Sequence, residues 1–166
     1  MSDTGTPRPE RRSIRLSPEE AWAFVEGSHS GVFTTLRRDG APISLPVWFV
    51  VIDRRIYVTT PATAKKVARL RHDARAAFVV ESGVRWVELK AVHLTGRATV
   101  IDDPAVAEKV REASGAKYDA YRTVRSDMPA ATQKRYSGQG AIIEFVADER
   151  IVSWDNARLM PASGSA

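Results

Sequence analysis

Two adjacent lysines provide the clearest chemical signal in the sequence. Lys65 and Lys66 follow a predicted short strand, Ile56 to Thr60, and fall in the first turn of a predicted helix. The first backbone N–H groups of a helix have no partner within it and, together with the helix dipole, attract anions. A cation there costs about 0.3–1 kcal/mol unless an anion offsets it. The pair therefore indicates a phosphate or carboxylate site; the alternative is two solvated surface lysines.

A second candidate binding element is the apolar segment from Leu45 to Phe49, which contains Pro46, Val47 and Trp48. Proline lacks the N–H that a sheet ladder needs, so it is confined to edge strands and bulges. An edge strand of this kind leaves backbone groups free beside a flat ligand. The alternative is that the aromatic side chains of the segment belong to the core.

Other kinds of catalytic centre find little support. There is no cysteine, and the three histidines, His29, His72 and His93, lack the spacing of a metal-binding motif. No Gly-x-Ser-x-Gly nucleophile elbow is present. The glycines at 138 and 140 lack the strand-to-helix context of a dinucleotide fingerprint. We therefore expect no metal site, and the sequence identifies no catalytic residue.

Length and composition indicate one domain with a sizeable core. The chain has 166 residues, 43% of them hydrophobic, and a net charge of +5. Its polar N-terminus is unlike a signal peptide, and no apolar run approaches the roughly 20 residues of a membrane span. We expect a cytoplasmic protein. Basic residues alternate with acidic ones and no nucleic-acid motif is found, so the charge favours a small anionic ligand over nucleic acid.

The first half of the chain is predicted to form one helix and then several strands. Ser17-Pro18-Glu19-Glu20 has the pattern of a capping box, and Gly27 ends the helix. Asp39-Gly40 is a hairpin signal. The predicted elements that follow are strands at 31–37, 42–52 and 56–60, a helix at about 62–72, and a strand at 75–81.

The second half is predicted to complete a small barrel. Residues 84–101 are too long for an ordinary strand, and their apolar alternation changes phase near Ala91 and Val92, which indicates a bulge or bend. A helix at about 104–113 is followed by a mostly helical or irregular stretch in which three tyrosines are possible packing anchors: Tyr118, Tyr121 and Tyr136. Strands at 141–146 and 150–154 are expected to form a last hairpin.

Six or seven strands, mostly connected by hairpins, with helices outside them, predict an antiparallel barrel of the α+β class. We expect residues 1–12 to be a disordered arm, 13–160 a single barrel domain and 161–166 a flexible tail.

Residues 29 to 155 resemble the split β-barrel family of flavin and deazaflavin oxidoreductases, which is pyridoxamine-5'-phosphate-oxidase-like and FMN-binding. The resemblance rests on short motifs in a fixed order. They are Gly31 to Thr35, Asp39 to Pro42, Pro46 to Phe49, Tyr57 to Thr60, Lys66 to Arg75, Gly96 to Ala98, Asp102 to Pro104 and Ile151 to Asp155. The resemblance implies a six- to seven-stranded antiparallel split β-barrel with peripheral helices, and a homodimer with two cofactor sites at its interface.

The resemblance also implies roles for individual residues. Lys66 corresponds to the lysine that binds the cofactor phosphate, with Lys65 as a neighbour that shares the load. The turn that would hold the phosphate with them includes Thr60, Pro61 and Ala64. The backbone of Pro46, Val47 and Trp48 and the hydroxyl of Thr59 would face the flavin ring. Trp154, and by a weaker correspondence Trp86, would come from the partner subunit.

The sequence departs from the family pattern at two places. Asp73-Ala74 replaces the usual Asp-Pro, which changes a turn but no chemistry. Ser44 stands near the place of an arginine found in true pyridoxamine-phosphate oxidases, which argues against vitamin B6 oxidation. Trp48-Phe49 and the arginine-rich flanks are more similar to the branch that uses coenzyme F420, a deazaflavin with a polyglutamate tail. The expected function is an F420-dependent reductase that transfers hydride to a small organic acceptor. The alternatives are an FMN-dependent oxidoreductase and a non-catalytic protein that binds a flavin or haem-type ligand.

Overall fold

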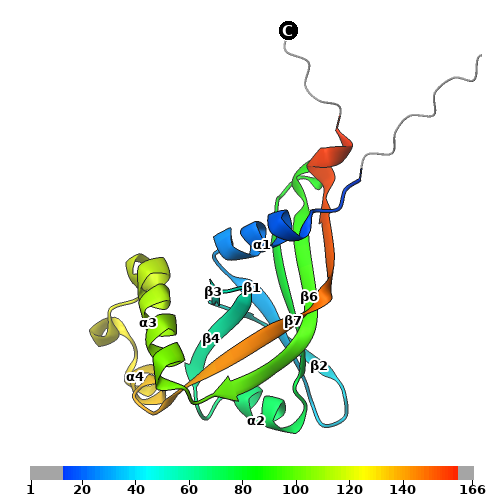
Figure 1. Ribbon diagram of the computed structural model, residues 1–166. Coiled ribbons are helices and arrows are strands. Elements are labelled where there is room, and N and C mark those ends of the chain that lie inside the picture. The colour runs from blue at the N-terminus through cyan, green and yellow to red at the C-terminus, as the bar shows by residue number, and fades with distance from the viewer. Residues whose placement is uncertain (1–12, 161–166) are drawn as a thin grey trace, which may run out of the picture.

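A curled seven-stranded antiparallel sheet forms the centre of the protein, and the computed structural model describes residues 13–160 (Figure 1). The order across the sheet is β2-β1-β5-β6-β7-β4-β3, and every neighbouring pair is antiparallel. The strands are β1 (Gly31–Leu36), β2 (Pro42–Val47), β3 (Val50–Ile52), β4 (Arg55–Pro61), β5 (Arg75–Ser82), β6 (Lys90–Ile101) and β7 (Gly140–Asp155). This confirms the predicted α+β split barrel. The predicted arm at 1–12 and tail at 161–166 lie outside the described residues.

The two edge strands of the sheet, β2 and β3, are consecutive in the chain. Only Trp48 and Phe49 separate them. A few residues span at most about 10 Å, so the sheet must curl until its edges approach each other. The predicted strand at 42–52 is therefore two strands with a break at these aromatic residues. Pro46 lies on an edge strand, as expected, and its register partner on β1 is Val32.

Residues 13–160 also form four α-helices: α1 (Pro18–Gly27), α2 (Lys65–His72), α3 (Pro104–Tyr118) and α4 (Ala130–Tyr136). The predicted capping box starts α1, where the Ser17 N–H donates to Glu20 Oε2 at 2.7 Å and the Glu20 N–H to Ser17 Oγ at 3.2 Å. Asp103 caps α3 by accepting from the N–H of Ala105. None of the helices within residues 13–160 combines the length and the apolar character that crossing a membrane requires.

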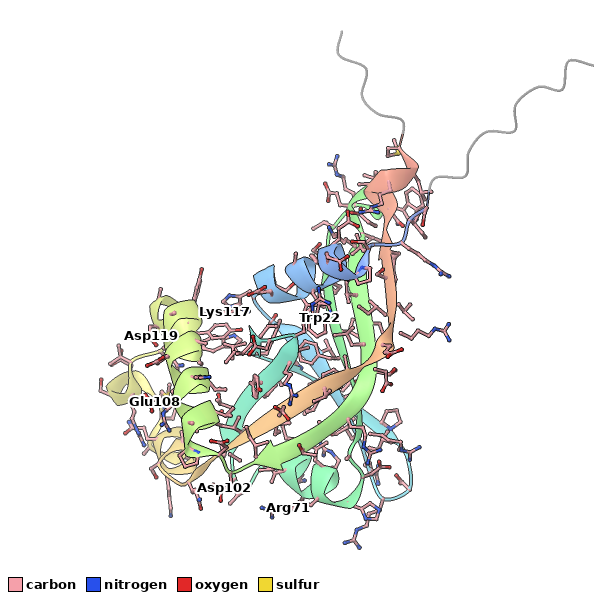
Figure 2. All side chains as sticks on the ribbon, viewed as in Figure 1. Trp22, Arg71, Asp102, Glu108, Lys117 and Asp119 are labelled. Carbon is pink, nitrogen blue, oxygen red and sulfur yellow. The ribbon has the colours of Figure 1, made fainter. Side chains whose placement is uncertain are left out.

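Helix α3 continues beyond its predicted end at 113 because its last turn is anchored on both sides. Tyr118 is buried beneath it. Lys117 extends from α3 towards the end of α1 (Figure 2), where its Nζ donates to the Glu26 carbonyl at 3.3 Å and lies 4.2 Å from the Phe49 ring centroid. Tyr118 is thus the packing anchor that the sequence indicated. Tyr121 and Tyr136 are exposed, so their prediction as anchors was wrong.

The predicted last hairpin is wrong, because β7 is one continuous strand that pairs with both β4 and β6. Leu94 pairs with Ile151 and Gly96 with Ala147, which leaves residues 148–150 of β7 opposite Thr95 alone. These three polar residues are exposed in a bulge where the sequence pattern resembled a turn. Figure 1 shows β6 and β7 as the two long, bent strands of the sheet.

The apolar pattern changes phase near Ala91 and Val92 as predicted, since both residues are buried, but the bulge predicted there is displaced. Residues 86–88 form a 3₁₀ turn, so the apolar residues there do not belong to the strand pattern of β6, which begins at Lys90. The register shift lies between Leu94 and Gly96 instead.

Aromatic rings fill the inside of the curled sheet. Phe33, Phe49, Phe78 and Phe145 are all buried, and the Phe49 and Phe78 ring centroids lie 4.8 Å apart. A smaller cluster under α3 comprises Val50, Tyr57, Val110 and Tyr118. Helices α1 and α2 pack on the strands that surround the main cluster, so the position of α2 is fixed by the core.

Candidate functional site

The first turn of α2 carries the two lysines that are predicted to form an anion site. The helix begins at Lys65, later than the predicted start near 62, so Lys65 and Lys66 are its first two residues. The N-cap is Ala64, which provides no side-chain oxygen for the N–H groups, and the first turn holds no acidic residue. Two cations at this end, with no carboxylate in the turn, favour an anion as the partner.

A hollow of about 1060 Å³ opens beside this turn, between α2 and the connection from β1 to β2. Five cationic side chains line it and only one carboxylate, that of Asp39, which pairs with Arg37 at 3.3 Å. The cations are Arg37, Arg38, Lys65, Lys66 and Arg69. The hollow is therefore strongly basic and suits a ligand with several negative charges.

The opposite side of the hollow is apolar. Ile43 and Leu45 of β2 line it, and the register sets them beside Thr35 and Phe33 of β1. Residues directly opposite each other in an antiparallel pair point to the same face. The inner face of an edge strand thus lies next to the basic groups, an arrangement that suits a ligand with an anionic end and an apolar body.

Helix α2 is held at this position by its apolar side and by one polar contact. Val67 and Leu70 are buried in the core. The Nε of Arg69 donates to Thr35 Oγ1 on β1 at 2.7 Å. These contacts bring the first turn of α2 next to the β1–β2 connection, which lies far from it in sequence.

A second hollow, of about 40 Å³, lies under α3 and is lined by residues that include Trp48, Thr59 and Tyr118. Trp48 stacks flat on Tyr118, with ring centroids 4.5 Å apart and planes 1° apart. A volume of this size holds about one water molecule. In this arrangement the small hollow does not admit a flavin-sized ring.

Burial shifts the pKa of two tyrosines that line the small hollow and of one lysine near them on α3. Tyr57 lines it and donates a hydrogen bond to Glu144 Oε1 at 2.8 Å. Burial, followed by this bond to a carboxylate, raises the pKa of Tyr57 to about 12. Burial also raises the pKa of Tyr118 and lowers that of Lys117. Within residues 13–160, no three His, Asp or Glu side chains come together in a way that suits a metal ion.

Comparison with known proteins places this architecture in a family. Residues 17–152 match the family described as pyridoxamine 5'-phosphate oxidase. The chain belongs to the pyridoxamine 5'-phosphate oxidase family. No curated protein sequence matches the chain.

Solved structures of this fold include a conserved hypothetical protein from Mycobacterium tuberculosis, which is 28% identical with a TM-score of 0.76 over 96% of this chain and 98% of that one. A FAD-binding protein from Mesorhizobium loti is 16% identical, with a TM-score of 0.63 over 83% of this chain and 93% of that one. HutZ, the heme storage protein of Vibrio cholerae, is 12% identical, with a TM-score of 0.63 over 85% of this chain and 96% of that one. The last two similarities show the fold alone.

In this member of the pyridoxamine 5'-phosphate oxidase family, the residues predicted for the phosphate end are partly brought together. Lys65, Lys66 and Ala64 line the basic hollow. Pro61 is half-buried at the end of β4, and Thr60 is buried beside it.

The residues predicted for the ring end are spread over two places. Pro46 and Val47 continue β2 beyond Leu45, with Pro46 exposed and Val47 buried. Trp48 and Thr59 lie at the small hollow under α3. Of the two aromatic residues in this segment, Phe49 is buried in the core, whereas Trp48 is 41% exposed.

The two tryptophans predicted to come from a partner lie away from α2 in their own chain. Trp154 is near the end of β7 and pairs with Ala91 at the start of β6, and Asn156 Nδ2 donates to the Trp86 carbonyl at 2.8 Å. This end of β6 and β7 is opposite to the end where α2 packs (Figure 1). Trp86 is 62% exposed and Trp154 37% exposed. Within one chain, therefore, neither ring reaches the basic hollow.

Sequence reasoning did not assign the arginines of the hollow to the site. In the sequence, Arg37 and Arg38 were considered only as contributors to the net charge, and Arg69 only as one residue of the Lys66 to Arg75 motif. Their signal was their position: the first two precede the Asp39-Gly40 turn, and Arg69 follows Lys66 by one helical turn on the same face. The turn and the helix are far apart in sequence, and they meet because α2 packs on β1.

Proposed function

We propose that this protein is an oxidoreductase that binds coenzyme F420, with the cofactor's phosphate at the first turn of α2 and its anionic tail along the arginines of the β1–β2 connection. The observation that carries the proposal is the excess of cationic over acidic side chains around the basic hollow. A single phosphate has at most about two negative charges at neutral pH. A cofactor that adds carboxylates to the phosphate makes fuller use of five cations, whereas FMN would be served by the lysines alone.

The residues present fit such a cofactor. Lys66 and Lys65 supply charge-assisted donors for the phosphate, with backbone N–H groups of the helix start. Arg37 and Arg38 are exposed on the rim and can follow a flexible tail. Ile43 and Leu45 provide the apolar surface that covers an aromatic ring system and excludes water from it. Beyond them, β2 is an edge strand with backbone groups that the sheet does not pair.

The chemistry is that of the cofactor. When bound in its reduced form, F420 would supply the hydride for reduction of an electron-poor double bond in a small organic acceptor, and solvent would supply the proton. The chain's own part is to hold the phosphate, orient the ring against β2 and keep the site dry. The rings of Trp154 and Trp86 from a second copy are proposed to complete the cover, in a homodimer.

The test is a pair of titrations with F420 and FMN, performed side by side at one ionic strength. We expect F420 to bind at least about tenfold more tightly, a difference of about 1.4 kcal/mol. Tighter binding of FMN would mean that the cofactor is a flavin and not a deazaflavin. Binding of neither would overturn the proposal.

A second candidate is a protein that binds a flavin or haem-type ligand without turnover. It is favoured by two proteins that share the fold, of which one is a FAD-binding protein and the other a heme storage protein. The discriminating measurement is the oxidation of reduced F420, followed by absorbance, with a panel of electron-poor acceptors. Tight cofactor binding with no oxidation by any acceptor would favour the second candidate.

A further inference from the structure

A hydroxyl group is buried on an otherwise apolar strand face. Thr35 is only 1% exposed, and it follows Phe33 on the inner face of β1, which is directed to the aromatic core. A hydroxyl in such a place costs free energy unless it forms a hydrogen bond. Thr35 Oγ1 accepts the Nε–H of Arg69 at 2.7 Å. The pair links a core strand directly to a side chain that lines the basic hollow.

The contact determines how Arg69 presents its remaining donors. The guanidinium is a rigid planar group with five N–H donors, so fixing Nε fixes the plane of the other two nitrogens. Within residues 13–160, the bond to Thr35 is the only side-chain hydrogen bond of Arg69, and no carboxylate lies within ion-pair distance of it. The two terminal nitrogens are therefore left for whatever occupies the hollow.

The other arginines of the hollow are held differently. Arg37 pairs with Asp39, and both side chains are more than half exposed. Arg38 is exposed on the same connection. A preorganised donor loses less conformational entropy when it binds than a mobile one does. Arg69 is thus the arginine of the hollow whose geometry is set before any ligand arrives.

We propose that Thr35 is a positioning residue which presets Arg69 as a planar donor for the phosphate, and that this pair makes the site select a phosphorylated cofactor over the same ring system without phosphate. The inference rests on the proposed function, since it assigns a role within the same site. It adds a selectivity element on β1 that does not itself touch the ligand.

The decisive substitution is Thr35→Val, which keeps the shape of the side chain and removes the hydroxyl. Thr35→Ser keeps the hydroxyl and is expected to retain the wild-type behaviour. The matched control is Thr34→Val. Thr34 is the neighbouring residue on the opposite face of β1, where its hydroxyl lies 2.8 Å from Ser44 Oγ, and it does not line the hollow.

The probes are two pairs that are matched apart from the phosphate end: tail-free F420 with its deazaflavin chromophore lacking phosphate, and FMN with riboflavin. The pair whose phosphorylated member wild-type protein binds more tightly is used for all variants. We expect Thr35→Val to weaken binding of the phosphorylated probe by about fivefold to tenfold. Binding of the probe without phosphate should change less than about twofold, and Thr34→Val should leave both affinities unchanged.

A double-mutant cycle separates positioning from a general structural effect. Arg69→Gln alone should weaken binding of the phosphorylated probe. Adding Thr35→Val to that variant should then cause almost no further loss of affinity. If Thr35→Val costs as much without Arg69 as with it, the proposal is overturned. Should the Thr35→Val protein fail to fold, Arg69→Lys replaces it. That variant keeps the charge and loses the planar fork, so it should lose the same phosphate selectivity.

Lys66→Ala distinguishes failure of this inference from failure of the proposed function. If Lys66→Ala weakens binding of the phosphorylated probe and Thr35→Val does not, the proposed cofactor site is supported and the role of Thr35 is refuted. If wild-type protein binds neither phosphorylated probe, or if Lys66→Ala binds like wild type, the proposed site is wrong and this inference falls with it.

Discussion

At the scale of single residues, the two lysines at the start of α2 differ in their surroundings. Lys65 is exposed, whereas Lys66 is half-buried, although both line the basic hollow. A half-buried cation interacts more strongly with a bound anion because less water screens the pair. The structure thus gives a physical reason to expect unequal contributions from two adjacent lysines.

We predict that Lys66→Ala weakens cofactor binding at least about tenfold, or about 1.4 kcal/mol, as expected for loss of a charge-assisted contact. Lys65→Ala should have a smaller effect. The measurement is a titration with F420 at fixed ionic strength. Lys134→Ala is the matched control, because Lys134 is an exposed lysine on α4 that does not line the hollow. An equal or larger loss for Lys65→Ala would mean that the roles of the two lysines are reversed.

A second residue-scale prediction concerns Tyr57, whose pKa is about 12 in the folded protein. An unfolded tyrosine has a pKa near 10. Below pH 10 both states keep the phenol proton, and the contribution of Tyr57 to stability is complete. Between pH 10 and 12 the unfolded state loses its proton first, so the free energy of unfolding falls by up to about 2 kcal/mol.

Tyr57→Phe should remove this alkaline loss. It also removes the bond to Glu144, so its stability at pH 8 should be lower by about 1 kcal/mol. The difference from wild type should shrink as the pH rises past 10, as measured by urea unfolding from pH 8 to 11.5. Tyr136→Phe, at an exposed tyrosine, serves as the control. Parallel stability curves for wild type and Tyr57→Phe would contradict the assignment.

At the scale of elements, local signals predicted most boundaries. The capping box at Ser17, the Asp39-Gly40 turn and the alternation in β1 each depend on a few neighbouring residues, and each appears in the structure. The polar run at 148–150 was misread because a turn and a bulge use the same residue types. What distinguishes them is the partner strand: β6 pairs with β7 on both sides of the run.

In the candidate site, too, the residues with a local sequence signal were predicted and those placed by long-range packing were not. The lysines of α2 were identified because a helix start can be read from nearby residues. Arg37 and Arg38 joined them only through the packing of Val67 and Leu70 into the core, which places α2 beside the β1–β2 connection. No local pattern encodes that approach, so the place of these two arginines beside the lysines could not be predicted.

The bulge between β6 and β7 gives the element-scale prediction. A Cβ on Gly96 would lie 2.1 Å from the Val146 carbonyl oxygen, and backbone cannot move away as a flexible side chain can. Gly96→Ala should therefore lower the free energy of unfolding by about 2 kcal/mol or more. Gly138→Ala is the control, since nothing lies within 4 Å of a Cβ there. Equal urea midpoints for both variants would show that the sheet adapts at the bulge.

At the scale of the whole molecule, the basic hollow lies at one end of the sheet, and the exposed Trp86 and Trp154 lie at the opposite end. Large aromatic side chains that remain exposed often mark a contact surface. In a symmetric dimer the same surface is present on both copies, so each copy can lend its tryptophans to the other's hollow. The proposed homodimer would thus bring together groups that one chain holds apart.

This arrangement predicts complementation between two defective proteins. Lys66→Ala and Trp154→Ala should each bind F420 weakly on their own. When the two are co-expressed with different tags and the mixed dimer is purified, one of its hollows has Lys66 from one copy and Trp154 from the other. That dimer should bind about one cofactor tightly, against two for wild type, because each intact site draws one residue from each copy. The other hollow lacks both groups. If the mixed dimer has no tight site, Trp154 acts within its own chain. If Trp154→Ala alone binds F420 like wild type, Trp154 has no part in binding, and a monomeric protein would exclude the arrangement at the outset.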